Sequence, residues 1–476
     1  MADPRGAILS GPLALEVARF GAPLALGMGL QTTFNLVDAY LIARLEPEVA
    51  GPALGAIGIC DQVAALGTIV SYGLSIATAA IMSRKHGSGD EEGMRRVAWQ
   101  SFLLVLALGA LFGVVGVAGA RTLMFDVVGA KGEVAELGAR YLTVMLGGSA
   151  SIFLLLHLTT IQRALGSSKT PVAMLLASNA LNLLLAVLLV YGPGEAPPIF
   201  AFGPKLAAAL GLPRLELMGA AWATVLARVA VLVPLAVVIV RRFGLFRADS
   251  RSRPDARVMG SILGIGWASS TQLVVRILAM LLTHSLVARA FTTAADQSAS
   301  TALGIVFRLE TMALFVGLGW GSAAQTFVGQ NLGARQPGRA KRSGLIAAGY
   351  NAAMMAALAV AYWRYGEPIV GFFDRSEPVM TVALSYMRWV GWSYVGLGVG
   401  IVLGAAMQGA GATRQTLILD SAVVFLFQLP ASLLTVFGLG YGYERLWAVV
   451  ALTYVAFALV YLKSYRRGAF LRTQLA

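Results

Sequence analysis

The fold is decided by residues 56–96, AIGICDQVAALGTIVSYGLSIATAAIMSRKHGSGDEEGMRR, and by residues 302–342, ALGIVFRLETMALFVGLGWGSAAQTFVGQNLGARQPGRAKR, which align without a gap. Eight of the 41 aligned positions are identical, and each copy runs from an apolar segment into a basic loop. The identical pairs are Ala56 and Ala302, Gly58 and Gly304, Ile59 and Ile305, Val70 and Val316, Gly73 and Gly319, Ala77 and Ala323, Gly87 and Gly333, and Arg96 and Arg342. Two similar apolar halves are a common design among membrane transporters.

The composition places the whole chain in a membrane. The 476 residues are 58% hydrophobic and only 13% charged, with a mean hydropathy of +0.75. Soluble proteins carry about 25% charged residues. Apolar runs of about 20 residues, long enough to cross a bilayer core, recur along the sequence. We therefore predict an all-α polytopic membrane protein that lies in a lipid bilayer.

About twelve helices of spanning length are expected. Six helices in each half give the halves the same orientation, so two six-helix lobes should be related by a pseudo-two-fold axis along the membrane normal. We place the N-lobe at 1–243, a charged cytoplasmic linker at 244–258 and the C-lobe at 259–476. The connection 191–215 is expected to be a plain outer loop. The helices are predicted at 14–45, 54–82, 97–120, 137–165, 172–192, 216–243, 259–290, 300–329, 343–364, 381–408, 416–438 and 445–465.

The basic residues indicate orientation. The formal net charge is +14, which in a soluble protein would suggest binding to nucleic acid. With Met1 in the cytoplasm, however, 23 of the 37 Lys and Arg lie on the cytoplasmic side and 10 lie outside. This is the positive-inside bias of membrane proteins. We predict a multi-pass protein of the inner (cytoplasmic) membrane, with both termini cytoplasmic and no nucleic-acid partner.

Motifs of soluble enzymes are missing from the sequence. It contains no GxxxxGK[ST] phosphate-binding loop, no HExxH zinc motif and no GxSxG nucleophile motif. Cys60 is the only cysteine, so the chain can form neither an internal disulfide nor a thiolate metal cluster. We predict that the protein is not an enzyme and has no cofactor and no bound metal.

The first predicted helix carries a polar stripe. Gln31, Asn35 and Asp38 are spaced so that all three lie on one face of the helix. A carboxylate is costly at that depth, so Asp38 is the leading functional candidate. Pro23 removes a backbone hydrogen bond a few turns earlier and is the candidate hinge. A buried carboxyl on a bendable helix can couple protonation to helix shape.

The other charged residues within apolar segments are first interpreted as structural ion pairs. Asp61, Glu310 and Asp420 are expected to pair with arginines inside the membrane. Glu310 is also a functional candidate, because the repeat aligns it with Ala64 and it therefore belongs to one half only. The intramembrane arginines are Arg228, Arg276, Arg308 and Arg388.

Several segments resemble the multidrug and toxic compound extrusion (MATE) family. The first helix, FGAPLALGMGLQTTFNLVDAYLIARL (residues 20–45), resembles the family's proline-bearing helix and its N-L-V-D core. The loops SRKHGSGD (83–90) and VGQNLGARQPGRAKR (328–342) resemble its GQ-x-x-G-A-G-D segments. QRALGSSKTP (162–171) and MQGAGATRQT (407–416) resemble its paired G-x-G-x-T loops. The resemblance extends over essentially the whole chain.

The resemblance implies two lobes in a V and efflux of organic, often cationic, compounds in exchange for H⁺ or Na⁺. It makes Asp38 the match of the family's coupling carboxylate. Asn182 matches an asparagine that often precedes a second acid by four residues, but this chain has Ala186 in the acid's place. A Na⁺ site needs hard oxygen ligands, whereas a single Asp suffices for H⁺. We therefore expect proton coupling and a DinF-like member of the family.

These considerations define a set of expected site residues and partners. The partners are small cationic organic compounds, H⁺ (or Na⁺) and lipid, and the protein is expected to be a monomer. The cation-coupling residues are expected to be Asp38, Asn35 and Asn182, the substrate-binding residues Asp38, Gln31, Phe34, Tyr141, Asn179 and Glu310, and the hinge Pro23.

Three alternatives stay open at this point. A Na⁺-coupled exporter of the same family is the first. A major-facilitator transporter would carry a G-x-x-x-D-R-x-G-R-type loop after its second helix, which SRKHGSGDEEGMRR fits poorly. A lipid-linked precursor flippase would line its cavity with several cations, for which Arg276 and Arg388 are candidates.

Overall fold

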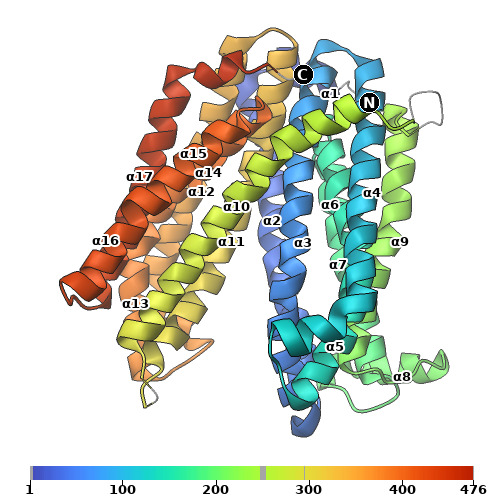
Figure 1. Cartoon of the computed structure of the whole chain (residues 1–476), viewed down its shortest axis with the longest axis vertical. Helices are drawn as coiled ribbons and strands as arrows, with labels where there is room; N and C mark the ends of the chain where they lie inside the picture. Colours follow the sequence, from blue (N-terminus) through green and yellow to red (C-terminus); the bar gives the residue numbers. More distant parts are fainter. Residues whose placement is uncertain (1–3, 247–252, 294, 475–476) are drawn as a thin grey trace.

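The computed structural model describes residues 4–246, 253–293 and 295–474, except for the side chains of residues 4, 5, 32–37 and 39. Figure 1 shows two helical bundles side by side. The α-helices are α1 (Pro4–Ser10), α2 (Leu13–Ala43), α3 (Pro47–Ser88), α4 (Glu91–Thr122), α5 (Gly132–Gly147), α6 (Ser149–Ala164), α7 (Lys169–Tyr191), α8 (Phe202–Ala209), α9 (Leu217–Phe243), α10 (Ala256–Phe291), α11 (Ser298–Gly333), α12 (Pro337–Gly371), α13 (Glu377–Val390), α14 (Tyr394–Gly409), α15 (Thr413–Ala422), α16 (Leu429–Leu433) and α17 (Tyr443–Arg467). Short 3₁₀ segments cover Pro198–Phe200, Gly391–Ser393 and Ala469–Arg472, and π-helical segments cover Leu123–Val127, Val423–Gln428 and Leu434–Gly438.

The number of membrane spans agrees with the prediction. Within the described ranges, eleven helical segments are long and apolar enough to cross a membrane, and the bent pair α5 and α6 can form a twelfth. The predicted all-α polytopic fold with about twelve spans is therefore confirmed.

The fourth predicted helix, 137–165, corresponds to two helices joined at a bend. α5 ends at Gly147, α6 begins at Ser149, and the two axes differ by 42°. Gly148 lies at the bend, where an added Cβ would come within 2.6 Å of the Val225 side chain on α9. The absence of a side chain at Gly148 lets α9 approach closely, and this close packing accompanies the bend.

Two further segments differ from the expectation. α1 precedes the first spanning helix and was not predicted. The outer connection 191–215, expected to be a plain loop, contains the 3₁₀ turn Pro198–Phe200 and the short helix α8. α8 leaves Phe202 and Leu206 exposed, and Figure 1 shows it projecting sideways from the bundle. Short amphipathic turns of this kind are hard to separate from loops by periodicity.

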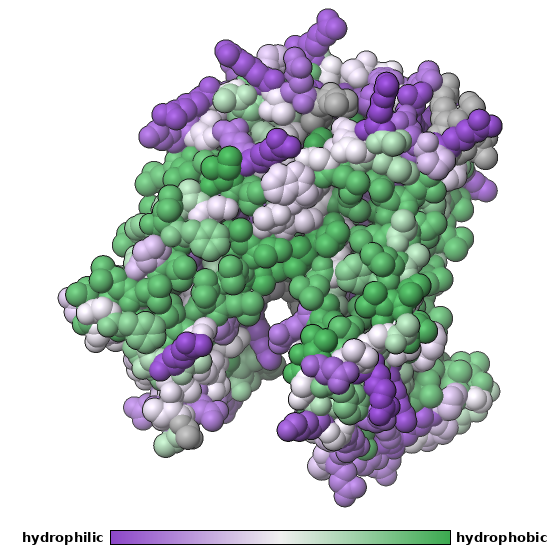
Figure 2. Space-filling view, viewed as in Figure 1, coloured by the Kyte–Doolittle hydropathy of each residue, from purple (hydrophilic) through white to green (hydrophobic). Residues whose placement is uncertain are grey.

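The two bundles leave a hollow between them. We call α1–α9 the N-lobe and α10–α17 the C-lobe; the lobe boundaries 1–243 and 259–476 and the linker 244–258 stay a prediction. Both termini lie at one end of the molecule, and α10 runs obliquely across both lobes (Figure 1). Figure 2 shows a hydrophobic band around the middle, polar residues at both ends, and a hollow that opens opposite the termini. We call the end with the termini the closed end.

Glycines matched by the repeat lie where the lobes touch. A Cβ on Gly73 of α3 would overlap the Ser270 hydroxyl on α10 of the other lobe. A Cβ on its repeat partner, Gly319 of α11, would overlap the backbone of Ala25 on α2. The Ser270 hydroxyl also donates to the Ile69 carbonyl oxygen of α3 at 3.2 Å. In each lobe, the glycine at this position of the repeat therefore lets a helix of the other lobe pack closely.

A second matched pair seals the closed end. A Cβ on Gly87 would overlap the carbonyl oxygen of Gln330, and one on Gly333 would overlap the carbonyl oxygen of Arg84. Arg84 and Gln330 are themselves aligned by the repeat. Gln330 also donates through Nε2 to the Ala164 carbonyl oxygen at 2.7 Å. The repeat thus builds a reciprocal backbone-to-backbone contact between α3 and α11.

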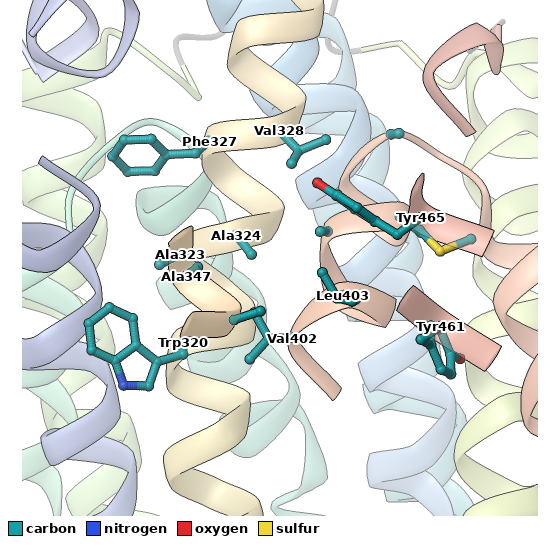
Figure 3. Packing of buried hydrophobic residues seen from close by; sticks show 14 of the residues in the cluster. Trp320, Ala323, Ala324, Phe327, Val328, Ala347, Val402, Leu403, Tyr461 and Tyr465 are labelled. Carbon is teal, nitrogen blue, oxygen red and sulfur yellow. The ribbon is translucent and has the colours of Figure 1, made fainter. Parts of the chain in front are cut away.

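α2 belongs to two hydrophobic cores. Its first half, with Val17 and Phe20, packs in the cluster built mainly from α11, α14 and α17, and the rings of Phe20 and Phe327 lie 5.6 Å apart. Figure 3 shows Trp320 and Phe327, two of the α11 side chains in this cluster. The last turn of α2, with Leu41, packs instead among N-lobe residues. Pro23 lies within the half that contacts the C-lobe.

The first loop of the repeat carries a helix cap. Asp90 precedes α4 and accepts hydrogen bonds from Lys85 Nζ and from the Gly93 backbone N–H, both at 2.8 Å. The Lys85 bond and then the Gly93 bond hold the pKa of Asp90 below its usual range. A depressed folded-state pKa means that the charge stabilises the fold above the unfolded value of about 3.9. This contribution is lost as the pH falls through the folded pKa.

We therefore expect Asp90→Ala to lower the free energy of unfolding by about 1 kcal/mol at neutral pH, because the cap is lost. Asp90→Asn keeps a capping oxygen and should cost less. Thermal unfolding in detergent, measured from acid to neutral pH, checks both. The difference between wild type and Asp90→Asn should shrink as the pH falls; a difference that stays constant would contradict the role given to the charge.

Candidate functional site

Polar and charged side chains gather inside the N-lobe. We call this group the Asp38 cluster. Its residues come from five helices of the N-lobe, and hydrogen bonds or electrostatic interactions connect them. They are Asp38 on α2, Asp61 on α3, Tyr141 on α5, Asn182 on α7, and Thr224 and Arg228 on α9.

Asp38 is held by neutral hydrogen-bond donors. The Asn182 side-chain amide Nδ2 lies 3.1 Å from Asp38 Oδ1 and 3.3 Å from Oδ2. The Thr224 hydroxyl lies 3.4 Å from Asp38 Oδ2 and 3.1 Å from Asn182 Oδ1. The Thr224 hydroxyl hydrogen is shared between these two acceptors, so α7 supplies the main donor to the carboxylate and α9 a weaker one. Such donors satisfy its oxygens without neutralising its charge.

The cluster has more acidic than basic groups. Arg228 interacts electrostatically with Asp38, Asp61 and the Tyr141 hydroxyl. Asp38 and Arg228 are half-buried, and Asp61 is exposed. When both carboxyl groups are ionised, the two negative charges exceed the single positive charge. The cluster can therefore attract a cation or take up a proton.

Several residues expected from the sequence meet here. Asp38 and Asn182 are in direct contact, and Tyr141, which is 5% exposed, interacts with Asp38 electrostatically. Asn179 lies one turn before Asn182 on α7, and its Nδ2 group is buried without a hydrogen-bond partner among the described residues. An unsatisfied buried donor is costly, so Asn179 is a candidate contact for a ligand.

The other residues expected at the site are not shown in contact with Asp38. Gln31 is half-buried on α2, two turns before Asp38. The side chains of Phe34 and Asn35 lie outside the described residues. Pro23 lies inside α2 without a break in the helix. Glu310 is not in the Asp38 cluster; it is buried in the C-lobe.

The expected pairing of buried acids with arginines was right in part. Asp420 is fully buried and forms an ion pair with Arg276 at 2.6 Å, which confirms that pairing. Asp61 interacts with Arg228 through its charge. The pairing expected for Glu310 was wrong, because tyrosine hydroxyls from three helices bond its carboxylate instead. Phenol groups satisfy the oxygens but leave the charge in place.

Sequence reasoning missed three members of the cluster. The sequence shows Asp61 and Arg228 as charges within apolar helices but predicts only structural pairing for them, and it gives no signal for Thr224. Threonine is common in membrane helices, and only the packing of α9 against α7 brings it to Asn182. In the described ranges, no group of three or more His, Cys, Asp or Glu could hold a metal ion.

Comparison with known proteins establishes the family. A model of the MatE family matches residues 23–188 and 274–434, which cover most of both halves. The chain belongs to this family. The resemblance seen in the motifs is therefore confirmed for the family, and the protein is a multi-pass membrane transporter rather than an enzyme. Members of this family export small organic compounds.

Curated relatives extend over nearly the whole chain. The probable multidrug resistance protein YpnP of Bacillus subtilis is 26% identical over 423 residues, with 88% of each chain covered. The FAD transporter of Shewanella oneidensis is 24% identical over 435 residues and covers 91% of this chain and 90% of its own.

A solved structure shows the same fold. It is an outward-facing conformation of a multidrug resistance MATE family transporter of the MOP superfamily. Its TM-score to this chain is 0.85 at 23% identity, and 98% of each chain is covered. The two-lobe arrangement of MATE transporters is thus the fold of this protein.

Proposed function

We propose that this MatE protein exports cationic, amphipathic organic compounds in exchange for H⁺, with Asp38 as the coupling carboxylate. The Asp38 cluster is the observation that carries the proposal. Two carboxylates face one guanidinium there, on half-buried or exposed side chains of a membrane-spanning bundle. Carboxylates inside a membrane protein are costly and usually functional.

Substrate and proton compete for the same charge in this scheme. With Asp38 and Asp61 ionised, the net negative charge of the cluster favours an organic cation. Protonation of Asp38 leaves Asp61 balanced by Arg228, so the cluster becomes neutral and its attraction for the cation falls. The proton therefore drives release of the substrate.

The packing of α2 supports a mechanical consequence. Asp38 lies fifteen residues after Pro23, about 22 Å along an ideal helix. Leu24 and Ala25, next to that proline, pack on Gly319 of α11. A bend of α2 at Pro23 would move the contact between the lobes. Pro23 is accordingly the proposed hinge between the coupling site and the C-lobe.

Proton coupling is favoured over sodium coupling by the groups around Asp38. Asn182 turns its N–H donors toward the carboxylate, and its oxygen accepts from Thr224. Ala186 supplies no second acid. A sodium ion needs several oxygen ligands, whereas a proton needs one carboxylate. We place the chain in a DinF-like group for this reason.

The remaining contacts and the location belong to the same proposal. Tyr141, Gln31 and Asn179 would line the substrate site. The roles expected for Phe34 and Asn35 stay predictions from the sequence, because their side chains lie outside the described residues. The chain would act as a monomer in the inner membrane with cytoplasmic termini. The hollow then opens to the outside (Figure 2), which corresponds to the releasing state.

Gradients imposed one at a time test the proposal. The purified wild-type protein is reconstituted into liposomes with ethidium, a fluorescent organic cation. We expect a pH gradient at equal Na⁺ to drive ethidium transport, and a Na⁺ gradient at equal pH to drive none above protein-free liposomes.

FAD, which the Shewanella oneidensis relative transports by name, supplies an anionic comparison in the same vesicles. Transport driven by Na⁺ at constant pH would favour the Na⁺-coupled alternative. Transport of FAD or of a lipid pyrophosphate without transport of ethidium would overturn the proposed substrate class and favour an exporter of anions or a flippase.

A further inference from the structure

The C-lobe contains an enclosed carboxylate that the proposed export mechanism does not use. Glu310 on α11 is 3% exposed. Its Oε2 accepts hydrogen bonds from the hydroxyls of Tyr386 at 2.6 Å and Tyr394 at 3.5 Å, and its Oε1 accepts one from Tyr454. Tyr386 and Tyr394 are each only 1% exposed. One carboxylate is thus tied to α13, α14 and α17.

The groups around Glu310 do not supply a positive charge. Every titratable group that interacts with it among the described residues is a tyrosine; they are Tyr362 on α12, Tyr386 on α13, Tyr394 on α14 and Tyr454 on α17. On neighbouring elements, the α10 side chain His284 stacks on Phe307 instead, and Arg308 and Arg388 are exposed. The Tyr362 hydroxyl donates to the Leu309 carbonyl oxygen rather than to Glu310.

The contrast with the other buried acid of the C-lobe is informative. Asp420 has Arg276 at 2.6 Å and is neutralised by an ion pair. Glu310 has hydrogen-bond donors only, so its charged form stays uncompensated in a low-dielectric interior. A metal ion would need lone pairs where the tyrosines present O–H groups. The enclosed space and the donor set leave a proton as the ligand that fits.

We propose that Glu310 is a second proton-binding site, located in the C-lobe and independent of Asp38. A proton that enters binds one carboxylate oxygen of Glu310 and converts that acceptor into a hydroxyl donor. The tyrosine that bonded this oxygen must then rotate or accept the new hydrogen bond. The proposal stands whether or not Asp38 couples transport.

Protonation at this site changes how α11 is held. When ionised, Glu310 joins α11 to three other C-lobe helices through one group. When protonated, it loses at least one of these donated bonds, and charge-assisted hydrogen bonds are the strong ones. α11 also carries Gly319, which receives α2 of the N-lobe. The site therefore lies on the helix that connects the two lobes.

Infrared difference spectroscopy of the protein in lipid bilayers tests the proposal. Spectra taken across a pH titration should contain a carboxylic-acid C=O band that Glu310→Gln removes and Asp38→Asn leaves in place. Tyrosine ring bands should change in the same step. Two results would overturn the assignment. One is loss of this C=O band in Asp38→Asn, and the other is persistence of the band in folded Glu310→Gln.

Two conservative variants keep the test decisive if Glu310→Gln fails to fold. Tyr386→Phe removes one donor to the charged carboxylate and should shift the midpoint of the band by about one pH unit to higher pH. Tyr362→Phe removes a neighbouring hydroxyl that donates elsewhere and should leave the midpoint unchanged. Equal midpoints in both variants would show that the tyrosines do not control a titrating Glu310.

Discussion

Asp38→Asn is expected to reduce pH-driven export of an organic cation to the level of protein-free liposomes, at least a tenfold loss. The amide cannot be protonated in the accessible pH range, and it leaves Asp61 opposite Arg228 with no surplus negative charge. Asn can still form hydrogen bonds with Asn182 and Thr224, so the free energy of unfolding should change by no more than about 1 kcal/mol. Transport of ethidium under an imposed pH gradient measures the effect.

Binding measured without a gradient separates coupling from damage to the fold. In the wild type, affinity for the cation should fall as the pH is lowered, because protons compete for the cluster. Asp38→Asn should bind weakly and with little dependence on pH. Asp126→Asn makes the same chemical change at an exposed position and should behave as wild type. Unchanged pH-driven transport by Asp38→Asn would contradict the role of Asp38.

Gly319→Ala is expected to open the contact between the lobes and to reduce export at least tenfold. The added Cβ overlaps the backbone of Ala25, which has no rotamer by which to move away. Overpacking of this kind costs about 1–3 kcal/mol. Gly73→Ala should act similarly at the other crossing, where the added Cβ would overlap both the Ser270 hydroxyl and the Gly266 carbonyl oxygen of α10. Transport and thermal unfolding in detergent measure both effects.

The repeat itself provides the control for this experiment. Gly58 and Gly304 are also a matched pair, but a Cβ at either position meets nothing within 4 Å. Alanine there should leave transport unchanged and, by improving helix propensity, should not lower stability. Closure can be followed with a cysteine at Ser83, which is fully buried, in a Cys60→Ser background.

The cysteine at position 83 should resist labelling by a thiol reagent when residue 319 is glycine. It should react when residue 319 is alanine. Equal transport and labelling in Gly319→Ala and Gly304→Ala would show that the contact between α2 and α11 is not needed for export. A reactive cysteine in both backgrounds would instead show that the closed end opens readily without any substitution.

The helical architecture was accessible from the sequence because it depends on local properties. A run of apolar residues must span the bilayer as a helix to satisfy its backbone, so composition and length suffice. The same argument could not find the bend at Gly148, since the position of a break depends on how closely α9 approaches. Nor could it find α8, whose one short apolar face resembles an ordinary loop.

The candidate site was accessible only in part, for a related reason. Asp38 stood out because a carboxylate is rare within an apolar helix, and this is visible in a single segment. Its partners Thr224 and Arg228 lie more than 180 residues away and reach it only through the packing of α9. Glu310 was singled out as a charge but assigned the wrong partners, because tyrosines from several helices meet there only in the folded lobe.

The sequence by itself determined the approximate number of membrane spans, the family, and the single carboxylate of the first helix. It also identified the paired glycines, as identities within the repeat. Only the tertiary structure decided their meaning. These glycines lie at the contacts between the two lobes: Gly73 and Gly319 form one pair, and Gly87 and Gly333 the other. The physical reason is that a sequence repeat shows which positions have equivalent environments in the two halves. It does not show which atoms of the two halves touch, because that contact forms only when both lobes are folded and packed together.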